Sequence, residues 1–204
     1  MAARLTALAC AAVAVNAARC PKFEDVAALS GPVGRFELDK YVGGASDYWY
    51  EVASHNLPVL TTGCQCTRYN NSRINDVDWT DAFECRKKSP SAKPTTFTSV
   101  GHASSSPNAT LGGAMTETFT VGSLAHSTQA YWVLDVVEGA GDTAAYKHAL
   151  VYACSSVLGV RSDFVYFFSR SPAGPGNDTL AKWRQWPGID TTSVRPVPQD
   201  GCGW

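Results

Sequence analysis

Three runs of residues decide the fold of this chain: Ala130-Tyr-Trp-Val-Leu-Asp-Val136, His148-Ala-Leu-Val-Tyr-Ala-Cys154 and Phe164-Val-Tyr-Phe-Phe-Ser169. All three are rich in β-branched and aromatic side chains, and none carries a helical apolar stripe longer than a turn or two. The cluster from Gly139 to Gly141 separates the first two runs, as a turn would. The pattern therefore predicts neighbouring β-strands.

Five further runs of the same kind precede these three, at Trp49–Ser54, Gln65–Tyr69, Asp76–Trp79, Thr95–Val100 and Met115–Val121. Turn-forming residues separate them at Asn70-Asn71, Ser104–Asn108 and Gly112-Gly113. Eight strands are the number that closes an antiparallel barrel around one small cavity. We therefore predict an all-β, up-and-down barrel over residues 49–169.

One helix is predicted after the last strand, over about residues 178–186. Asn177 or Asp178 can cap it, and Pro187-Gly188 prevents it from continuing. Its apolar face would consist of Leu180, Trp183 and Trp186. Such a face has only the outside of the barrel to pack against, so we expect the helix there, followed by an extended tail over residues 187–204 that is tethered through Cys202.

Composition narrows the possible functions. The 204 residues carry a net charge of -1, with 45% hydrophobic and 17% charged residues, which suits one domain with a sizeable core and no nucleic-acid partner. The four histidines show no metal-binding or metalloprotease spacing, and there is no nucleophile-elbow or phosphate-loop motif. We therefore expect no metal, no cofactor and no hydrolase activity. The histidines are His55, His102, His126 and His148.

The N-terminus predicts a signal peptide over residues 1–17, with Val15 and Ala17 at the small-residue positions before the cleavage site. A buried first helix is the alternative interpretation. Residues 18–204 would then form a single secreted domain, and no later stretch is long and apolar enough to span a bilayer. Three glycosylation acceptors fit the secretory route: Asn70, Asn108 and Asn177.

Six cysteines remain after removal of the signal peptide: Cys20, Cys64, Cys66, Cys85, Cys154 and Cys202. In an oxidising compartment this even number predicts three disulfides, and spacing alone leaves all fifteen pairings open. The close pair Cys64 and Cys66 has the chemistry to ligate a soft metal, but disulfides are the better interpretation in that compartment.

In several segments the chain resembles the lipocalin family, particularly its apolipoprotein D-like and plant chloroplast-lipocalin branches. Their order and spacing over most of the mature chain carry the resemblance, and one departure is that Gly43 and Gly44 stand five or six residues before the strand-opening Trp49, where the family usually has Gly two residues before. The segments are Phe36-Glu-Leu-Asp-Lys-Tyr41, Trp49-Tyr-Glu-Val-Ala-Ser54, Gly63-Cys-Gln-Cys-Thr-Arg-Tyr69, Tyr131-Trp-Val-Leu-Asp135, Tyr146-Lys-His-Ala-Leu-Val-Tyr-Ala-Cys154, Phe167-Phe-Ser-Arg-Ser-Pro172 and Pro198-Gln-Asp-Gly-Cys202.

The resemblance implies that Trp49 lies at the closed end of the barrel under the guanidinium of Arg170. This is a structural pair, because a guanidinium over an indole is a favourable cation–π contact. Similarity to apolipoprotein D further implies the disulfides Cys20–Cys154 and Cys64–Cys202, which leaves Cys66 and Cys85 for each other. The chloroplast kinship also permits a plastid lumen as an alternative to the extracellular space.

A lipocalin interior is a cup, open at one end and lined by alternate residues of each strand. The family places Tyr166 inside, so Phe164 and Phe168 would share its face, while Val165 and Phe167 would pack against the helix. The resemblance helps to nominate further wall residues, although any one of these rings has a plain core position as its alternative. They are Tyr41, Tyr69, Phe119, Tyr131 and Tyr152.

The function implied is that of a monomeric carrier that binds or sequesters a fatty acid, sterol, retinoid or carotenoid without converting it. One alternative is a lipocalin-fold enzyme that acts on a lipid or xanthophyll, like the violaxanthin de-epoxidase relatives. That chemistry needs acids in the cup, and the strand-borne candidates Asp135 and Glu117 are both expected to be exposed or at strand ends. A second alternative is a secreted inhibitor or scavenger that acts through its loops.

Overall fold

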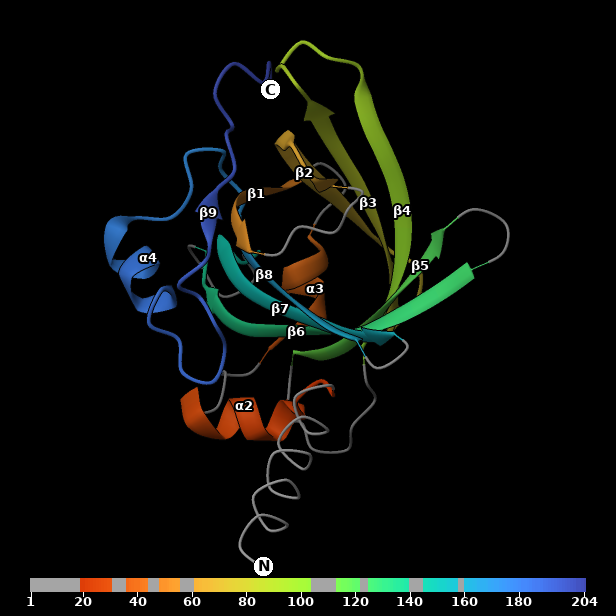
Figure 1. The fold of residues 1–204 in the computed structure, drawn as a ribbon, viewed down its shortest axis with the longest axis vertical. Coiled ribbons are helices and arrows are strands. Elements are labelled where there is room, and N and C mark those ends of the chain that lie inside the picture. Colours follow the sequence, from red (N-terminus) through yellow and green to blue (C-terminus); the bar gives the residue numbers. More distant parts are fainter. Residues whose placement is uncertain are drawn as a thin grey trace, which may run out of the picture.

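Eight antiparallel strands form a closed barrel in the computed structural model (Figure 1). Each strand pairs with the next, and β1 pairs with both β2 and β8, which closes the ring and confirms the predicted fold class. The strands are β1 (Tyr48–His55), β2 (Cys64–Arg73), β3 (Asp78–Lys87), β4 (Pro94–Ala103), β5 (Ala114–Val121), β6 (Ala125–Val137), β7 (His148–Val157) and β8 (Val160–Ser169).

The structure describes residues 19–30, 36–43, 48–55, 61–103, 113–121, 125–139, 145–157 and 160–204. The predicted signal peptide over residues 1–17 and the acceptor Asn108 lie outside these ranges, so both stay predictions.

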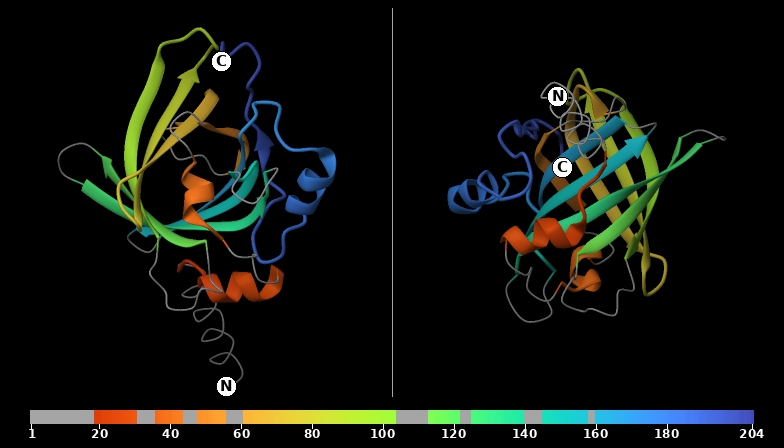
Figure 2. Two further views of the ribbon diagram at one scale, coloured as in Figure 1. Left: turned by 180° about the vertical axis from the view of Figure 1, so that it is seen from behind. Right: turned by 60° about the horizontal axis from the view of Figure 1, so that its bottom comes forward.

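Within the described ranges, three helices and one short strand accompany the barrel: α2 (Phe23–Ser30), α3 (Leu38–Val42), α4 (Asn177–Trp183) and β9 (Arg195–Pro196). α3 lies across one end of the barrel, whereas α2 and α4 lie on its outside (Figures 1 and 2). On α4, Trp183 packs edge-on against Phe167 of β8 with 5.2 Å between ring centroids. The predicted position of this helix against the barrel wall is therefore confirmed.

The predicted ends of α4 are wrong. Gly176, in an extended conformation, is the N-cap, so Asn177 and Asp178 lie in the first turn and cap nothing with their side chains. There the carboxylate of Asp178 still favours the helix through the helix dipole. The helix ends at Trp183, and Trp186 lies in a following turn, because the residue before Pro187 is disfavoured in helical conformation.

Strand alternation divides the apolar residues into an inner and an outer core. On β8, Phe164, Tyr166 and Phe168 belong to the inner cluster, while Val165 and Phe167 belong to the outer cluster with Trp183 and Trp186. The outer cluster also receives α2, whose Phe23 meets Trp132 of β6 at 5.4 Å. The helices are thus fixed by outward side chains, which leaves the inner side chains to form the cup.

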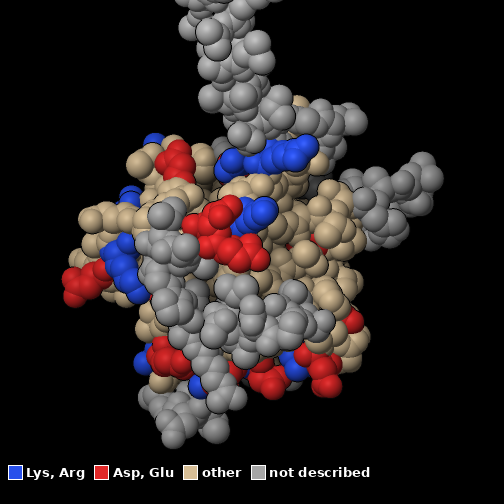
Figure 3. Space-filling model, turned by 90° about the horizontal axis from the view of Figure 1, so that it is seen from below, with Lys and Arg blue, Asp and Glu red and all other residues tan. Residues whose placement is uncertain are grey.

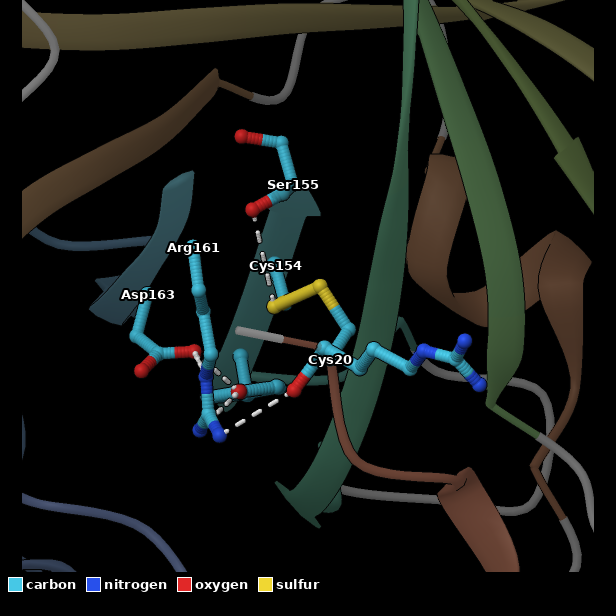
Figure 4. A network of polar contacts seen from close by, with 7 residues as sticks. Cys20, Cys154, Ser155, Arg161 and Asp163 are labelled. Carbon is cyan, nitrogen blue, oxygen red and sulfur yellow. Dashed lines mark hydrogen bonds and ion pairs between the residues drawn. A yellow bond between two sulfur atoms is a disulfide. The ribbon is translucent and has the colours of Figure 1, made fainter. Parts of the chain in front are cut away.

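The predicted disulfide Cys20–Cys154 is present and ties the segment before α2 to β7. Figure 4 shows the polar contacts around it. The Arg161 side chain pairs with Asp163 at 2.9 Å and donates to the carbonyl of Arg19 at 3.3 Å. This bridge joins positions 134 residues apart, so it restricts the unfolded chain over a long loop.

The other two predicted disulfides are wrong, because the structure pairs Cys64 with Cys85 and Cys66 with Cys202. The cause is a bulge in β2 between Gln65 and Arg68, where Cys66 adopts a φ of 52°. In a regular strand Cys64 and Cys66 would share a face, but the bulge breaks that alternation. Cys64 therefore meets β3, and Cys66 meets the C-terminal tail.

The tail completes the barrel wall where β1 and β2 separate. These strands pair only from Tyr48 to Tyr50, and beyond that β9 takes the position beside β1. The Gln199 amide donates to the carbonyls of Glu51 and Thr67, at 2.8 and 3.0 Å, and so bridges the two strands. The Cys66 N–H donates to the Pro198 carbonyl at 2.8 Å. The last residues of the chain are thus part of the wall.

Gly101 leaves room for Trp79, and this gives a first prediction. A Cβ at position 101 would overlap the six-membered ring of Trp79, which is itself almost completely buried. We expect Gly101→Ala to lower the free energy of unfolding by about 1–3 kcal/mol through overpacking. Urea unfolding measures this. The control is Gly176→Ala, where a Cβ meets nothing within 4 Å and the loss of the N-cap glycine is expected to cost about 1 kcal/mol or less. Equal losses in the two variants would contradict the argument.

Candidate functional site

The closed end of the barrel is organised by Trp49 and Arg170. The guanidinium of Arg170 lies 3.9 Å from the centroid of the Trp49 ring, as the resemblance implied. The carbonyl of Tyr41, in α3, accepts hydrogen bonds from both side chains, at 2.7 Å from Arg170 Nη2 and 2.9 Å from Trp49 Nε1. This contact fixes α3 across the end of the barrel.

Gly43 explains how the chain accommodates its departure from the family spacing. It ends α3 with a φ of 78°, and a Cβ there would lie 2.6 Å from Arg170 Nη2. The missing side chain lets the guanidinium reach the Tyr41 carbonyl, although Gly43 is farther from Trp49 in sequence than the family pattern has it. Glycine is therefore needed here both for its backbone conformation and for space.

Inside the barrel, above the closed end, lies a cavity with an empty volume of about 340 Å³, counting the part that is open to solvent. Of the lining residues that the structure describes, six are aromatic and two are acidic. Of the predicted wall residues, the cavity is lined by Tyr69, Phe119, Tyr131, Tyr166 and Phe168. Its other lining residues are Thr61, Asp81, Phe97 and Glu117.

Two predicted wall residues lie in the inner core without lining this cavity. Tyr41 lies below it, with its hydroxyl 2.6 Å from that of Tyr131. Phe164 stacks on Tyr166 with 6.5 Å between ring centroids. Both belong to the inner core. Strand alternation put Phe164 of β8 on the correct side, whereas Tyr41 belongs to α3 and reaches the interior from the closed end.

The prediction for Tyr152 is wrong, because its side chain lies outside the barrel. It belongs to the outer cluster, packs on Trp132 at 5.2 Å and donates a hydrogen bond to Asp163 at 2.5 Å. The reason is register: Tyr152 is directly opposite Val165, and cross-strand partners share one face of a sheet. Since Val165 faces outward, Tyr152 must do so too.

Acidic side chains in the cup are the main feature that the sequence interpretation missed. Glu117 was expected to be exposed or at a strand end, but it is buried inside the barrel with 4% exposure. Its carboxylate accepts hydrogen bonds from Ser99 at 2.5 Å and from Gln129 at 3.0 Å. Asp81 of β3 is equally buried beside it. The predicted third strand ended at Trp79, whereas β3 continues to Lys87 and brings Asp81 onto the inner face.

Asp81 and Glu117 share their electrostatic environment. Burial raises the pKa of both carboxyls, and the charge of Glu117 raises that of Asp81 further. The hydrogen bonds that Glu117 accepts from Ser99 and Gln129 oppose the rise at Glu117. Two carboxyls this close cannot both ionise easily in a buried site, so the pair holds a shared proton to a higher pH than two separate carboxyls would.

A third carboxyl, Glu51 of β1, lies in the same interior. Tyr69 donates a hydrogen bond to its Oε2 at 2.8 Å. Burial raises the pKa of Glu51 to about 7, against the opposing effect of hydrogen bonds from Ser54 and Tyr69. The Tyr69 hydroxyl is therefore occupied by the protein itself, as is that of Tyr131. In this part of the cup, carboxyl groups replace tyrosine hydroxyls as the groups that can orient a ligand.

The other acid nominated for catalysis, Asp135, takes no part in the cup. It lies on the outer face of the barrel, where Lys182 and Trp183 of α4 donate to its Oδ2 at 2.7 and 2.8 Å. Its role is to hold α4 on the wall. Asp135 is thus on the outside of the barrel, as expected, and the enzyme alternative loses it as an acid in the cup.

The described residues contain neither a metal-binding cluster nor a membrane-spanning helix. Within the described ranges, no three His, Cys, Asp or Glu side chains gather in a way that could hold a metal ion. None of the helices in the described part of the chain could cross a bilayer by its length and hydropathy. On the face shown in Figure 3, acidic and basic side chains are interspersed, without a continuous basic surface.

Comparison with solved structures finds proteins of the same architecture. No family model matches the chain, and no curated protein matches its sequence. Among solved structures, lobster apocrustacyanin A1 superimposes with a TM-score of 0.54 at 16% identity, covering 89% of this chain and 93% of that one. A complex of LTBP1 with leukotriene C4 gives 0.51 at 19% identity, with 84% and 92% covered.

The siderocalin Ex-FABP gives a TM-score of 0.50 at 14% identity, covering 76% of this chain and 93% of that one. These similarities show that the chain has the lipocalin fold. Its assignment to the apolipoprotein D-like branch stays a prediction.

Proposed function

We propose that this protein binds a small hydrophobic ligand in the barrel and carries or sequesters it unchanged. The observation that carries the proposal is the cavity inside the closed barrel, lined mainly by aromatic side chains. Apolar walls with a few convergent polar groups are typical of small-molecule sites. Proteins of the same fold bind such molecules, as the LTBP1 complex with leukotriene C4 illustrates.

The volume of the cavity also limits the size of the ligand. Its empty volume of about 340 Å³ includes space that is open to solvent, so the enclosed part is smaller, which favours a compact ligand over a long carotenoid. Burying about 400 Å² of apolar ligand surface contributes roughly 10 kcal/mol. Association costs about 4 kcal/mol or more, so we expect micromolar dissociation constants or somewhat tighter binding.

The remaining parts of the proposal concern location and modification. Three disulfides are consistent with an extracellular or other oxidising compartment, and we propose secretion as a monomer, with the plastid lumen as the alternative. Among the described acceptors, Asn177 is exposed at the start of α4, whereas Asn70 is half-buried and paired within β2. Asn177 is therefore the better candidate for glycosylation.

Two matched tyrosine variants test the site. We expect Tyr166→Leu, inside the cup, to weaken binding of retinol or oleate about tenfold, the effect of losing roughly 1.4 kcal/mol of aromatic and polar contact. Tyr152→Leu, outside the barrel, should leave affinity unchanged. Tryptophan fluorescence quenching measures binding, and chromatography of the extracted ligand shows whether it is unchanged. Absence of saturable binding of either probe, or an equal effect of the two variants, would contradict the proposal.

A lipocalin-fold enzyme is the second candidate, and the buried carboxyls are the specific observation that favours it. The proton held by Asp81 and Glu117 is available to an oxygen of a bound lipid or xanthophyll, so the pair could act as a general acid. Recovery of a chemically altered ligand, with turnover lost in Glu117→Gln, would support this candidate over the carrier. Action through loops, the third interpretation, would appear as a co-purifying protein partner.

A further inference from the structure

A band of polar side chains from consecutive strands runs along the inner wall at the level of the cavity floor, and two of its members, Asp81 and Glu117, line the cavity. Asn71 of β2 is directly opposite Asp81 of β3, and Asp81 is directly opposite Ser99 of β4. Glu117 of β5 bonds to Ser99 and is directly opposite Gln129 of β6. Cross-strand partners share a face, so these five side chains lie at one level of the inner wall.

Two hydrogen-bond acceptors in this band have no partner. Oδ1 of Asp81 and Oδ1 of Asn71 are both buried and receive no hydrogen bond, and each residue is only 3% exposed. Buried acceptors that lack a donor are costly, which makes them strong recognition groups for a ligand that supplies one. A ligand group with several hydrogen-bond donors would therefore satisfy these acceptors.

The acidic charge of the cavity favours a donor group that is cationic. Asp81 and Glu117 are two carboxyls side by side, and the cavity-lining residues that the structure describes include no Lys, Arg or His. A cationic group brought by a ligand would compensate the carboxylate charge that the protein leaves unbalanced. A ligand carboxylate would instead add a further negative charge to the same site, which disfavours a fatty acid with its head group at the floor.

The apolar walls fit the same ligand. Phe97 lies two residues from Ser99 on β4, and Phe119 lies two residues from Glu117 on β5, in both cases toward the open end. The centroids of these two rings are 6.1 Å apart. On the other side of the band, Trp79 and Tyr131 close the floor, 6.2 Å apart. Aromatic faces attract cations as well as apolar groups, so the rings suit both parts of an amphiphilic amine.

We propose that the cup binds a protonated primary amine carried on a compact apolar body. The ammonium donates to Asp81, Glu117 and Asn71 at the floor, and the apolar body lies among Phe97, Phe119 and Phe168 toward the open end. This inference rests on the proposed function, because it names the ligand class of the same cavity. It commits to an ammonium over the hydroxyl, carbonyl or carboxylate head group of the other ligand classes.

Three ligands that differ only in the head group test it: 2-phenylethylamine, 2-phenylethanol and 3-phenylpropanoate. By calorimetry at pH 7 we expect the amine to bind about tenfold or more tightly than the alcohol, and the carboxylate to bind weakest. Asp81→Asn and Glu117→Gln should each weaken amine binding about tenfold while changing alcohol binding about twofold or less. Both substitutions preserve shape and remove a buried charge, so folding is expected to be retained.

The matched control is Glu84→Gln on the outer face of β3, where the carboxylate pairs with Arg68 at 3.1 Å. It should leave the affinity for all three ligands unchanged. Equal affinity for amine and alcohol, or amine binding that is insensitive to Asp81→Asn and Glu117→Gln, overturns the amine proposal and leaves the hydrophobic carrier standing. If none of the three ligands, retinol or oleate binds, the proposed function itself fails.

Discussion

Glu51→Gln is expected to stabilise the protein by about 3 kcal/mol at pH 8 and to leave its stability at pH 4.5 nearly unchanged. The pKa of Glu51 rises from 4.5 to about 7 in the folded barrel because burial disfavours its charge. Between these values the folded state holds a proton that the unfolded state has lost, so stability falls as pH rises and is fully present only below about 4.5. Gln has the same shape, carries no charge and still accepts from Tyr69.

Urea unfolding at pH 4.5, 6 and 8, with disulfides intact, measures this effect. The difference between variant and wild type should grow across the window and level off above pH 7. Asp81 and Glu117 contribute in the same direction, so the variant should keep the part of the slope that belongs to them. The control Glu84→Gln, whose carboxylate is 21% exposed, is expected to shift stability by about 1 kcal/mol or less at all three pH values. Parallel curves for Glu51→Gln and wild type would refute the assignment.

Trp49→Ala is expected to cost about 4 kcal/mol, the largest loss among the single substitutions considered. The indole is completely buried, contacts Tyr41 at 5.3 Å and Phe168 at 6.3 Å, and lies under the Arg170 guanidinium. Its removal leaves a cavity and removes one of the two hydrogen bonds to the Tyr41 carbonyl. For a chain of this size the loss corresponds to a fall in Tm of about 10 °C.

Differential scanning calorimetry of Trp49→Ala and Trp204→Ala separates burial from cation–π contact. Trp204 also lies against a guanidinium, that of Arg68 at 4.2 Å, but it does so on the outside of the barrel and is only half-buried. We expect Trp204→Ala to cost about 1 kcal/mol. A similar fall in Tm for both variants would show that Trp49 contributes no more than its cation–π contact.

The number and order of the barrel strands could be predicted because they depend on local composition. β-branched and aromatic runs with turn residues between them identify all eight strands, and alternation puts Tyr166 inside and Val165 outside. The closed-end pair of Trp49 and Arg170 came from resemblance, and the structure places it in contact. Side-chain direction follows from a two-residue period wherever the strand is regular.

The errors arise where that period is interrupted or where a strand is longer than its apolar run. The bulge at Cys66 redirects one sulfur to the tail, which no spacing argument reveals. Thr80 and Asp81 appear as a polar end to an apolar run, although they continue β3 into the cup. Tyr152 could have been placed correctly, because pairing it with Val165 fixes its face.

The Cys66–Cys202 bridge and the Gln199 contacts have a consequence for biosynthesis. The wall between β1 and β2 is completed by residues that lie about 136 positions after the cysteine they must reach. Synthesis runs from the N-terminus, so β1 and β2 are made long before this segment, and Cys66 stays without its partner until Cys202 has been made. Cys66 is fully buried in the folded protein, but until then its thiol is open to exchange, so the bridge that closes this seam forms late.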